Sequence, residues 1–333
     1  GVSNVIDHIT MASTGNATDF GDLSVAREEL TGACSPTRGL FAGGETPTNQ
    51  NVIDSIEIMT TGNAVDFGDL TESRQSQNNG VVCSSTRGLF AGGSTGSDSK
   101  TIDFVTIASQ GNAIDYGDLQ RAIYDQASGS NGVLGVFAAG YGGGYYRDIE
   151  EITITSGGTT TDHGAETLVN NAAASGSCNA HGGLNDGYSG TRIRPFNEAG
   201  GDRGLYLGGE PVPFQIQFIS ISTTGNANTF SDSPVAAQDT NGGGNKTRAF
   251  IYSGNNGSSN TSDIRYVEFS TRGNLAFFGD STAAKQIVGC ASNNTRLLAG
   301  GGSTPSNVNN IDHITMASIG NAADFGDLTV ARK

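Results

Sequence analysis

The triplet Asp-Phe-Gly is the first feature of this sequence that suggests chemistry, because in protein kinases its aspartate holds magnesium. The triplet begins at Asp19, Asp66 and Asp324. A kinase also needs a glycine-rich phosphate loop, a strand lysine and a His-Arg-Asp segment, and this set is missing from the sequence. The triplet recurs instead at a regular spacing along the chain, so we expect it to be structural.

Acidic residues next to this triplet have a structural interpretation as well. Short carboxylates at chain turns commonly accept turn amides or pair with a nearby arginine. The residues concerned are Asp22, Asp69, Asp118 and Asp327, with Arg27, Arg74, Arg121 and Arg332 as the expected partners.

The four cysteines do not form a metal-binding pattern, because no two of them lie within five residues of each other. Cys34, Cys83 and Cys290 occupy equivalent positions of a repeating pattern, and Cys178 lies in the corresponding region of a fourth unit. Equivalent positions of different units are far apart in space, so we expect small buried thiols and no disulfides.

The histidines do not indicate a catalytic centre. His8 and His313 are equivalent positions of the repeat, whereas His163 and His181 lie in its irregular part. A copper oxidase would need tyrosine, histidine and cysteine ligands in one cluster, and no such cluster is marked in the sequence. We therefore predict a protein that is not an enzyme and has no cofactor and no metal.

Two loops break the regular spacing and are the candidate binding sites. Function is concentrated on loops carried by a rigid scaffold, and polar side chains mixed with aromatic ones suit contacts with sugars or proteins. In residues 172–202 the candidates are His181, Asn185, Asp186, Tyr188, Arg192, Arg194 and Phe196. In residues 140–148 they are Tyr141, Tyr145 and Tyr146. The longer segment is alternatively a solvated insertion or an oligomer contact.

Composition and charge exclude several classes of protein. Glycine supplies 50 of 333 residues, without the period of three that collagen requires. The chain carries 18 basic and 33 acidic residues, a formal charge of −15. Nucleic acids and anionic membranes bind clustered basic residues, so neither is an expected partner. No stretch of 18 apolar residues is present, and the start at Gly1 suggests a processed or trimmed chain.

The sequence is an internal repeat. The segment 4–27, NVIDHITMASTGNATDFGDLSVAR, returns almost unchanged at 309–332. Seven copies of this phrase are present, and the Gly-Asn pair within it recurs at spacings of 47 to 49 residues, as from Asn16 to Asn63 and on to Asn112. A second phrase, TRGLFAGG at Thr37, alternates with the first in six copies. One unit thus contains four short β-like runs separated by turn residues.

Four strands in about 47 residues, repeated around seven times, are typical of a β-propeller. We predict one all-β domain over residues 1–333, with seven blades. Neighbouring blades would bury their faces against each other through equivalent aromatic residues. These are Phe20, Phe67, Tyr116, Phe230, Phe278 and Phe325.

The two ends of the chain leave the blade count open. Seven copies of the first phrase accompany only six of the second. The two strands missing from the first unit would lie upstream, or a segment after Lys333 would supply them, and either option gives seven blades. The alternative is a ring of six blades plus a surplus N-terminal half-blade, which would expose an unpaired β edge.

The order of residues within one unit resembles the kelch repeat. The residues that carry this resemblance are Arg38, Leu40, Phe41, Gly43, Gly44, Ile53 to Ile58, Phe67, Leu70 and Arg74. The resemblance covers nearly the whole chain, although phenylalanine or tyrosine stands where kelch blades usually carry tryptophan. The phrase Gly-Asn-Ala-X-Asp-Phe-Gly-Asp-Leu also resembles repeats in virion and tail-fibre proteins of marine tailed phages.

These resemblances imply a structural or adhesive module on the exterior of a virion or cell. We expect its loops to contact other structural proteins of an assembly, a second copy of the chain, or a host surface glycan or receptor. One alternative is a carbohydrate-active or copper enzyme built on the propeller. Another is an intracellular kelch adaptor, whose BTB-type or F-box-type domain would lie outside this chain.

Overall fold

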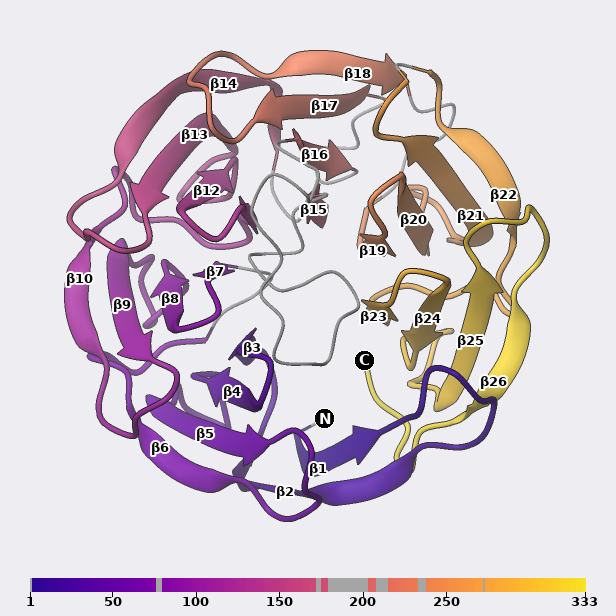
Figure 1. The fold of residues 1–333 in the computed structure, drawn as a ribbon, viewed down its shortest axis with the longest axis horizontal. Coiled ribbons are helices and arrows are strands. Elements are labelled where there is room, and N and C mark those ends of the chain that lie inside the picture. Colours follow the sequence, from indigo (N-terminus) through magenta and orange to yellow (C-terminus); the bar gives the residue numbers. More distant parts are fainter. Residues whose placement is uncertain are drawn as a thin grey trace.

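The computed structural model describes residues 2–75, 80–171, 175–178, 203–207, 215–232, 238–271 and 273–333, and the regular structure within these ranges is β-strand throughout. The strands form six four-stranded sheets and one two-stranded sheet, all antiparallel, arranged around a central axis as a β-propeller (Figure 1). Within each four-stranded sheet the strands follow one another in chain order, with the first nearest the axis and the fourth at the rim (Figure 1).

We name the four-stranded sheets blades A to F in chain order, and the two-stranded sheet the half-blade. The half-blade consists of β1 (Ser3–His8) and β2 (Thr18–Arg27). Blade A consists of β3 (Thr31–Cys34), β4 (Arg38–Ala42), β5 (Val52–Glu57) and β6 (Val65–Asp69). Blade B consists of β7 (Val81–Cys83), β8 (Arg87–Ala91), β9 (Thr101–Thr106) and β10 (Ile114–Asp118). Blade C consists of β11 (Ala127–Ser130), β12 (Leu134–Ala138), β13 (Tyr146–Thr153) and β14 (Thr161–Asn171).

The remaining blades have the same organisation. Blade D consists of β15 (Ser175–Cys178), β16 (Arg203–Leu207), β17 (Gln215–Ser220) and β18 (Asn228–Asp232). Blade E consists of β19 (Asn241–Gly244), β20 (Arg248–Asn255), β21 (Asn260–Glu268) and β22 (Ala276–Asp280). Blade F consists of β23 (Gly289–Ser292), β24 (Arg296–Gly300), β25 (Asn310–Thr315) and β26 (Ala323–Asp327).

The all-β propeller predicted from the repeat is therefore confirmed, but the seven-bladed form of that prediction is not. The structure has six complete blades, and the half-blade lies between blades A and F (Figure 1). This is the arrangement that the sequence left as the alternative. The first unit of the chain supplies only its third and fourth strands, because the second phrase of the repeat occurs in six copies.

The Asp-Phe-Gly triplet forms a β-bulge on the outer strand of each unit that carries it. In blade A, Asp66 lies opposite Asp54 and Gly68 lies opposite Ile53, so Phe67 is the extra residue of β6. The same one-residue shift recurs in the half-blade and in blades B, D, E and F, whereas β14 of blade C has two extra residues at this place. A bulge re-aims one side chain, and the ring of Phe67 is 3% exposed in the core between blades A and B. The triplet is structural, as predicted.

Adjacent outer strands are joined by the Gly-Asn turn of the repeat. The amide of Gly62 donates to the carbonyl of Phe20 at 2.7 Å, and the amide of Asp22 donates to Asn63 Oδ1 at 3.1 Å. The same glycine amide bond is made by Gly111 to Phe67, Gly158 to Tyr116, Gly225 to His163, Gly320 to Phe278 and Gly15 to Phe325. The last of these bonds joins blade F to the half-blade. The ring therefore closes at its rim through the same glycine amide bond that joins the other neighbouring units.

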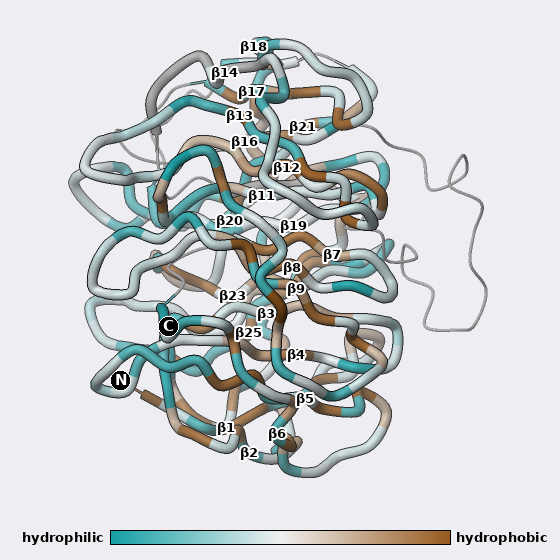
Figure 2. Tube along the Cα trace, turned by 90° about the vertical axis from the view of Figure 1, so that its left-hand side faces the viewer, coloured by the Kyte–Doolittle hydropathy of each residue, from teal (hydrophilic) through white to brown (hydrophobic). Residues whose placement is uncertain are grey.

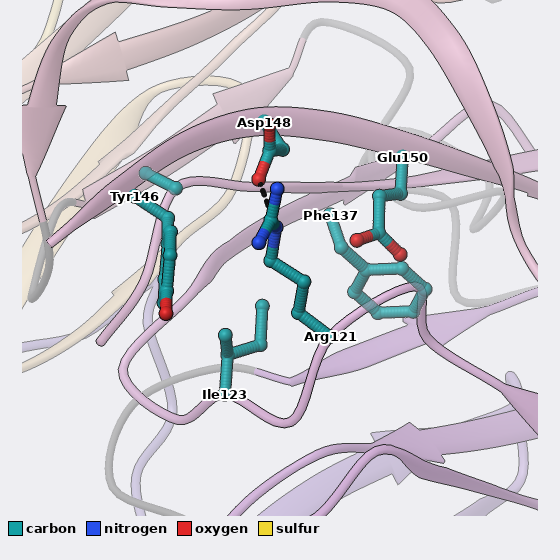
Figure 3. Close-up of a pocket in the computed structure, with 7 residues that line it drawn as sticks. Arg121, Ile123, Phe137, Tyr146, Asp148 and Glu150 are labelled. Carbon is teal, nitrogen blue, oxygen red and sulfur yellow. Dashed lines mark hydrogen bonds and ion pairs between the residues drawn. The ribbon is translucent and has the colours of Figure 1, made fainter. Parts of the chain in front are cut away.

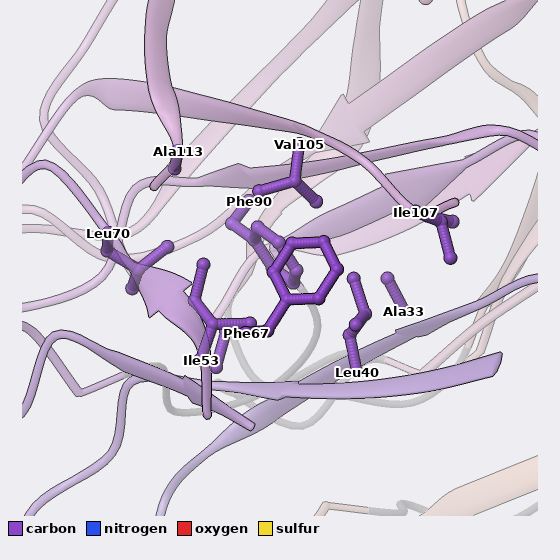
Figure 4. Packing of buried hydrophobic residues seen from close by; sticks show 10 residues of the cluster. Ala33, Leu40, Ile53, Phe67, Leu70, Phe90, Val105, Ile107 and Ala113 are labelled. Atoms are coloured by element: carbon purple, nitrogen blue, oxygen red, sulfur yellow. The ribbon is translucent and has the colours of Figure 1, made fainter. Parts of the chain in front are cut away.

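The hydrophobic core lies between the blades. Between blades A and B it contains Leu40 and Phe67 from one blade and Phe90 and Val105 from the other, which point toward one another (Figure 4). Figure 2 shows the same distribution along the chain, with apolar segments on strands and mostly pale or hydrophilic turns at the edges. Neighbouring four-stranded sheets therefore bury the faces that they turn toward each other, which accounts for the low charged fraction of 15%.

Ion pairs between an arginine and an aspartate cross from one unit to the next, which corrects the pairing expected from the sequence. The expected partners of the arginines were the aspartates that follow the triplet within the same unit. Each arginine instead reaches an aspartate on the third strand of the following unit. These pairs are Arg27–Asp54 (2.8 Å), Arg74–Asp103 (2.8 Å) and Arg332–Asp7 (2.5 Å), while Arg121 pairs with Asp148 (2.7 Å) and Asp118 with Lys100 (2.8 Å).

A candidate binding surface built on tyrosines

The residues proposed from the sequence as a binding surface fall into two groups. The seven candidates in the long loop lie outside the described residues: His181, Asn185, Asp186, Tyr188, Arg192, Arg194 and Phe196. Of residues 172–202 the structure describes only strand β15. The tyrosines of the shorter loop are all described, and they follow strand β12 of blade C.

Two of these tyrosines form a cluster with a third that sequence analysis did not identify. The rings of Tyr124 and Tyr141 lie 5.4 Å apart between centroids, and those of Tyr141 and Tyr145 lie 5.3 Å apart. Tyr124 comes from the connection between blades B and C, and its backbone exchanges two hydrogen bonds of 2.8 and 2.9 Å with Tyr141. All three residues are half-buried, so each ring keeps part of its surface open to solvent. We name Tyr124, Tyr141 and Tyr145 the tyrosine cluster.

The equivalent positions of other blades are polar. The backbone bridges that place the tyrosine cluster recur between the corresponding loops. They connect Glu28, Glu45 and Asn49 at blade A, Gln75, Ser94 and Asp98 at blade B, and Gln286, Ser303 and Asn307 at blade F. The same backbone scaffold thus carries short polar side chains elsewhere in the described ranges and aromatic ones at blade C. A local break in the repeat of this kind is a signal that comparison of the repeats alone could have found.

The electrostatic surroundings of the tyrosine cluster are acidic. Burial raises the pKa of the Tyr124 hydroxyl, and the carboxylates of Asp125 and Asp98 raise it further. The phenol therefore stays neutral and can donate a hydrogen bond as well as accept one. Aromatic faces beside carboxylates and hydroxyls suit a ligand that has apolar C–H faces and hydroxyl edges.

Tyr146, the third tyrosine expected on this surface, has a different role. The guanidinium of Arg121 lies 5.0 Å from the centre of its ring, and Arg121 is held by Asp148 at 2.7 Å (Figure 3). The Tyr146 hydroxyl donates to the carbonyl of Gly142 at 2.8 Å. These contacts hold the end of the loop that carries Tyr141 and Tyr145. Tyr146 therefore supports the tyrosine cluster without being part of it.

An open hollow lies between the equivalent loops of blades E and F. It has a volume of about 570 Å³, and its lining is rich in amides and hydroxyls, including Asn255, Asn260, Gln286, Ser303 and Thr304. The amide of Asn255 donates to Asn260 at 3.1 Å and to Gln286 at 3.2 Å. Because these groups already bond to one another, this hollow offers a ligand fewer hydrogen-bonding groups, and we favour the tyrosine cluster as the candidate site.

The reactive side chains in the described ranges do not gather into a centre. Cys34 and Cys290 form no disulfide, as predicted, but Cys34, Cys83 and Cys290 are each half-buried, whereas the sequence predicted buried thiols. Burial raises the pKa of the Cys290 thiol to about 12, with Lys285 opposing the shift, so this thiol is a weak nucleophile at neutral pH. Within the same ranges, no group of three histidines, cysteines or carboxylates is arranged to hold a metal ion.

Comparisons with known proteins do not assign the chain to a family. No protein-family model matches the sequence, and no curated protein matches it either. Among the described residues, no helix is long and apolar enough to cross a membrane. The fold and the tyrosine cluster are therefore the observations from which a function must be argued.

Proposed function

We propose that this protein is a non-enzymatic attachment module and that its tyrosine cluster binds a surface glycan. The observation that carries this proposal is the replacement of short polar side chains by Tyr124, Tyr141 and Tyr145 at one blade of an otherwise repetitive ring. A rigid scaffold that carries an aromatic patch suits recognition, because the patch is held in place before the ligand arrives. The acidic neighbours Asp98 and Asp125 would accept hydrogen bonds from sugar hydroxyls.

Replacing Tyr141 by alanine tests this function. Tyr141 lies between the other two rings, so its loss removes the centre of the tyrosine cluster. We expect glycan affinity to fall by about tenfold to thirtyfold, or about 1.4–2 kcal/mol. A glycan array with the purified chain would identify the ligand, and titration calorimetry would compare the affinities of the two proteins.

The matched control is Ser94→Ala, which changes the equivalent position of blade B. Its affinity should equal that of the unchanged chain, and both variants should show the circular dichroism spectrum of the original. Absence of any glycan ligand would contradict the proposal, and so would equal binding by Tyr141→Ala.

We further propose that the module acts on the exterior of a virion or cell, as part of an assembly. This location is supported by the resemblance of the recurring phrase to repeats of phage virion and tail-fibre proteins, and by the excess of 33 acidic over 18 basic residues. Quantitative mass spectrometry of purified particles should find the chain in a fixed ratio to the major structural proteins. A chain found only in the soluble fraction of lysed cells would contradict this location.

A further inference from the structure

The half-blade lacks the two inner strands that every complete blade has. Strand β5 of blade A is paired on both sides, with β4 and with β6, whereas the only described partner of β1 is β2. The consequence is visible in the burial of equivalent isoleucines. Ile53, Ile102 and Ile311 are 0%, 0% and 2% exposed, while Ile6 of β1 is half-buried. The inner edge of β1 is therefore an unpaired strand edge of the kind that accepts another strand.

Arg332 indicates where the backbone of a further strand would lie. In the first junction Arg27 contacts Asp54 at 2.8 Å and also donates to the carbonyl of Phe41 at 3.0 Å, and Phe41 lies opposite Asp54. In the next junction Arg74 makes the same two contacts, to Asp103 and to the carbonyl of Phe90. Arg332 contacts Asp7, but no described strand lies opposite Asp7 on the inner side. The side chain of Arg332 is accordingly 26% exposed, against 0% for Arg27.

The facing side of blade A shows a matching gap. At other junctions the arginine that begins the second strand of a blade donates to a carbonyl of the next unit. These bonds are Arg38 to Ile107 (2.9 Å), Arg87 to Ile154 (3.2 Å), Arg248 to Met316 (2.6 Å) and Arg296 to Met11 (2.8 Å). The equivalent carbonyl on blade A belongs to Ile58, and no described arginine reaches it.

Apolar side chains on this side of blade A are also more exposed than their equivalents in other blades. Ile58 is 40% exposed, whereas its equivalents Ile107 and Ile154 are 0% exposed. Phe41 is half-buried, whereas Phe90 at the equivalent position is 1% exposed. The side chains that would cover Ile58 and Phe41 are those of an inner strand pair belonging to the half-blade. We name the space inward of β1, bordered by Arg332, Ile58 and Phe41, the closing slot.

We propose that the closing slot binds a β-hairpin with the sequence pattern of the inner strand pairs, which completes a seventh blade. Every inner strand pair that the structure describes already belongs to a complete blade, so the occupant is none of the described strands. Its chemistry follows from the repeat: a strand of small residues, a turn, and a second strand that begins with arginine, continues with apolar residues and ends in Gly-Gly. The slot and the tyrosine cluster lie on different elements, so this proposal stands or fails independently of the proposed function.

The register of the bound hairpin follows from blade A. There Phe41 lies opposite Asp54, Gly39 opposite Ile56 and Arg38 opposite Glu57. By the same spacing, the arginine of the hairpin would lie opposite Thr10 and would donate to the carbonyl of Ile58. The residue three positions later would lie opposite Asp7, and its carbonyl would accept from Arg332. Main-chain bonds to β1 would supply affinity, and these two arginine contacts would supply specificity.

A synthetic peptide with the sequence of residues 31–44, TGACSPTRGLFAGG, tests the proposal directly. Labelled with a fluorophore and titrated with the 333-residue chain, it should show saturable binding by fluorescence anisotropy. A peptide with alanine in place of its arginine should bind at least tenfold more weakly. Hydrogen exchange of the β1 amides should slow on binding, while exchange of the β9 amides in blade B should stay unchanged.

Matched variants of the chain locate the binding. Ile58→Asp should weaken binding at least tenfold, because it places a charge under the hairpin. Met59→Asp should leave binding unchanged, because Met59 is 80% exposed and is not one of the residues that border the closing slot. Both positions are exposed in the unbound chain, so both variants should melt at the temperature of the original. No saturable binding, or equal binding by Ile58→Asp, would overturn the proposal. So would self-association of the chain alone that the peptide reverses, since the occupant would then be a second copy.

Discussion

Replacing Asp54 by asparagine is expected to lower the free energy of unfolding by about 3–5 kcal/mol, because it leaves the charge of Arg27 buried without its partner. The side chains of Asp54 and Arg27 are both 0% exposed and lie 2.8 Å apart. Asparagine keeps the size of the side chain and an oxygen that can accept from the amide of Ser24, as Asp54 does at 3.2 Å. The change therefore isolates the loss of the negative charge.

The corresponding change in blade C, Glu150→Gln, should act in the opposite direction. Glu150 lies opposite Phe137, as Asp54 lies opposite Phe41, but Ile123 occupies the place of the arginine. Burial raises the pKa of Glu150, and the hydrogen bonds from Thr160 and Gln120 only partly oppose this shift. Blade D has glutamine at the same place, since Gln217 lies opposite Tyr206 and is 1% exposed. A neutral amide thus fits this position.

The pH dependence of the Glu150→Gln effect follows from the sign of that shift. A carboxyl whose pKa is raised by folding contributes stability that is fully present below its unfolded pKa, about 4.3, and is lost as the pH rises through the folded value. At pH 7 we expect the glutamine variant to be more stable by about 0.5–2 kcal/mol. Near pH 4 the difference should vanish.

Urea denaturation followed by circular dichroism measures both effects, since the chain contains no tryptophan for fluorescence. The slope of the transition should be the same for all three proteins, so that midpoints can be compared. Stabilisation by Asp54→Asn, or destabilisation by Glu150→Gln at pH 7, would show that the buried carboxyls do not act as these contacts imply.

The second large effect is expected from Gly279→Ala, which should destabilise the ring by about 3 kcal/mol or more. A Cβ atom at Gly279 would overlap the carbonyl of Gly320 in the next blade. This neighbour is backbone held by its own hydrogen bond to Phe278 at 3.0 Å, so it cannot move aside as a side chain would. Blades E and F would have to separate at the rim.

The matched control lies across the same junction. A Cβ atom at Gly320 would have no atom within 4 Å, so Gly320→Ala should change the unfolding free energy by no more than about 0.5 kcal/mol. Thermal melting of the two variants compares them directly. If Gly279→Ala melts at the same temperature as Gly320→Ala, the close backbone contact between Gly279 and Gly320 does not constrain stability, and the prediction is wrong.

Much of the fold could be predicted from the sequence because the information is repeated. A single run such as 38–42 is ambiguous, but its recurrence in six units with fixed turn residues identifies it as a strand. The aromatic residues between blades were predicted for the same reason, and Phe67, Phe230 and Phe325 are 3–4% exposed. The blade count was less certain because it depends on two strands at one end, where repetition gives no further evidence.

The side-chain partners could not be predicted in this way. Arg27 and Asp22 are close in sequence, but Arg27 is the last residue of β2, where the chain passes to blade A, and its side chain pairs with Asp54 of that blade. Tyr124 was missed because it belongs to a connection between blades and meets Tyr141 only after the ring is formed. In both cases the contact depends on how one unit packs against the next. The spacing of the repeat along the sequence does not predict that packing.

The rim junctions have a consequence for how such a chain can change over generations. The bonds from Gly62 to Phe20 and from Gly15 to Phe325 join main-chain atoms, and they are alike at internal junctions and at the closing one. A unit produced by gene duplication would therefore meet a neighbour that already fits it, whatever side chains either had acquired. Loops such as the one that carries Tyr141 can change in sequence, because closure of the ring depends on the glycine bonds at the rim and not on the loop side chains.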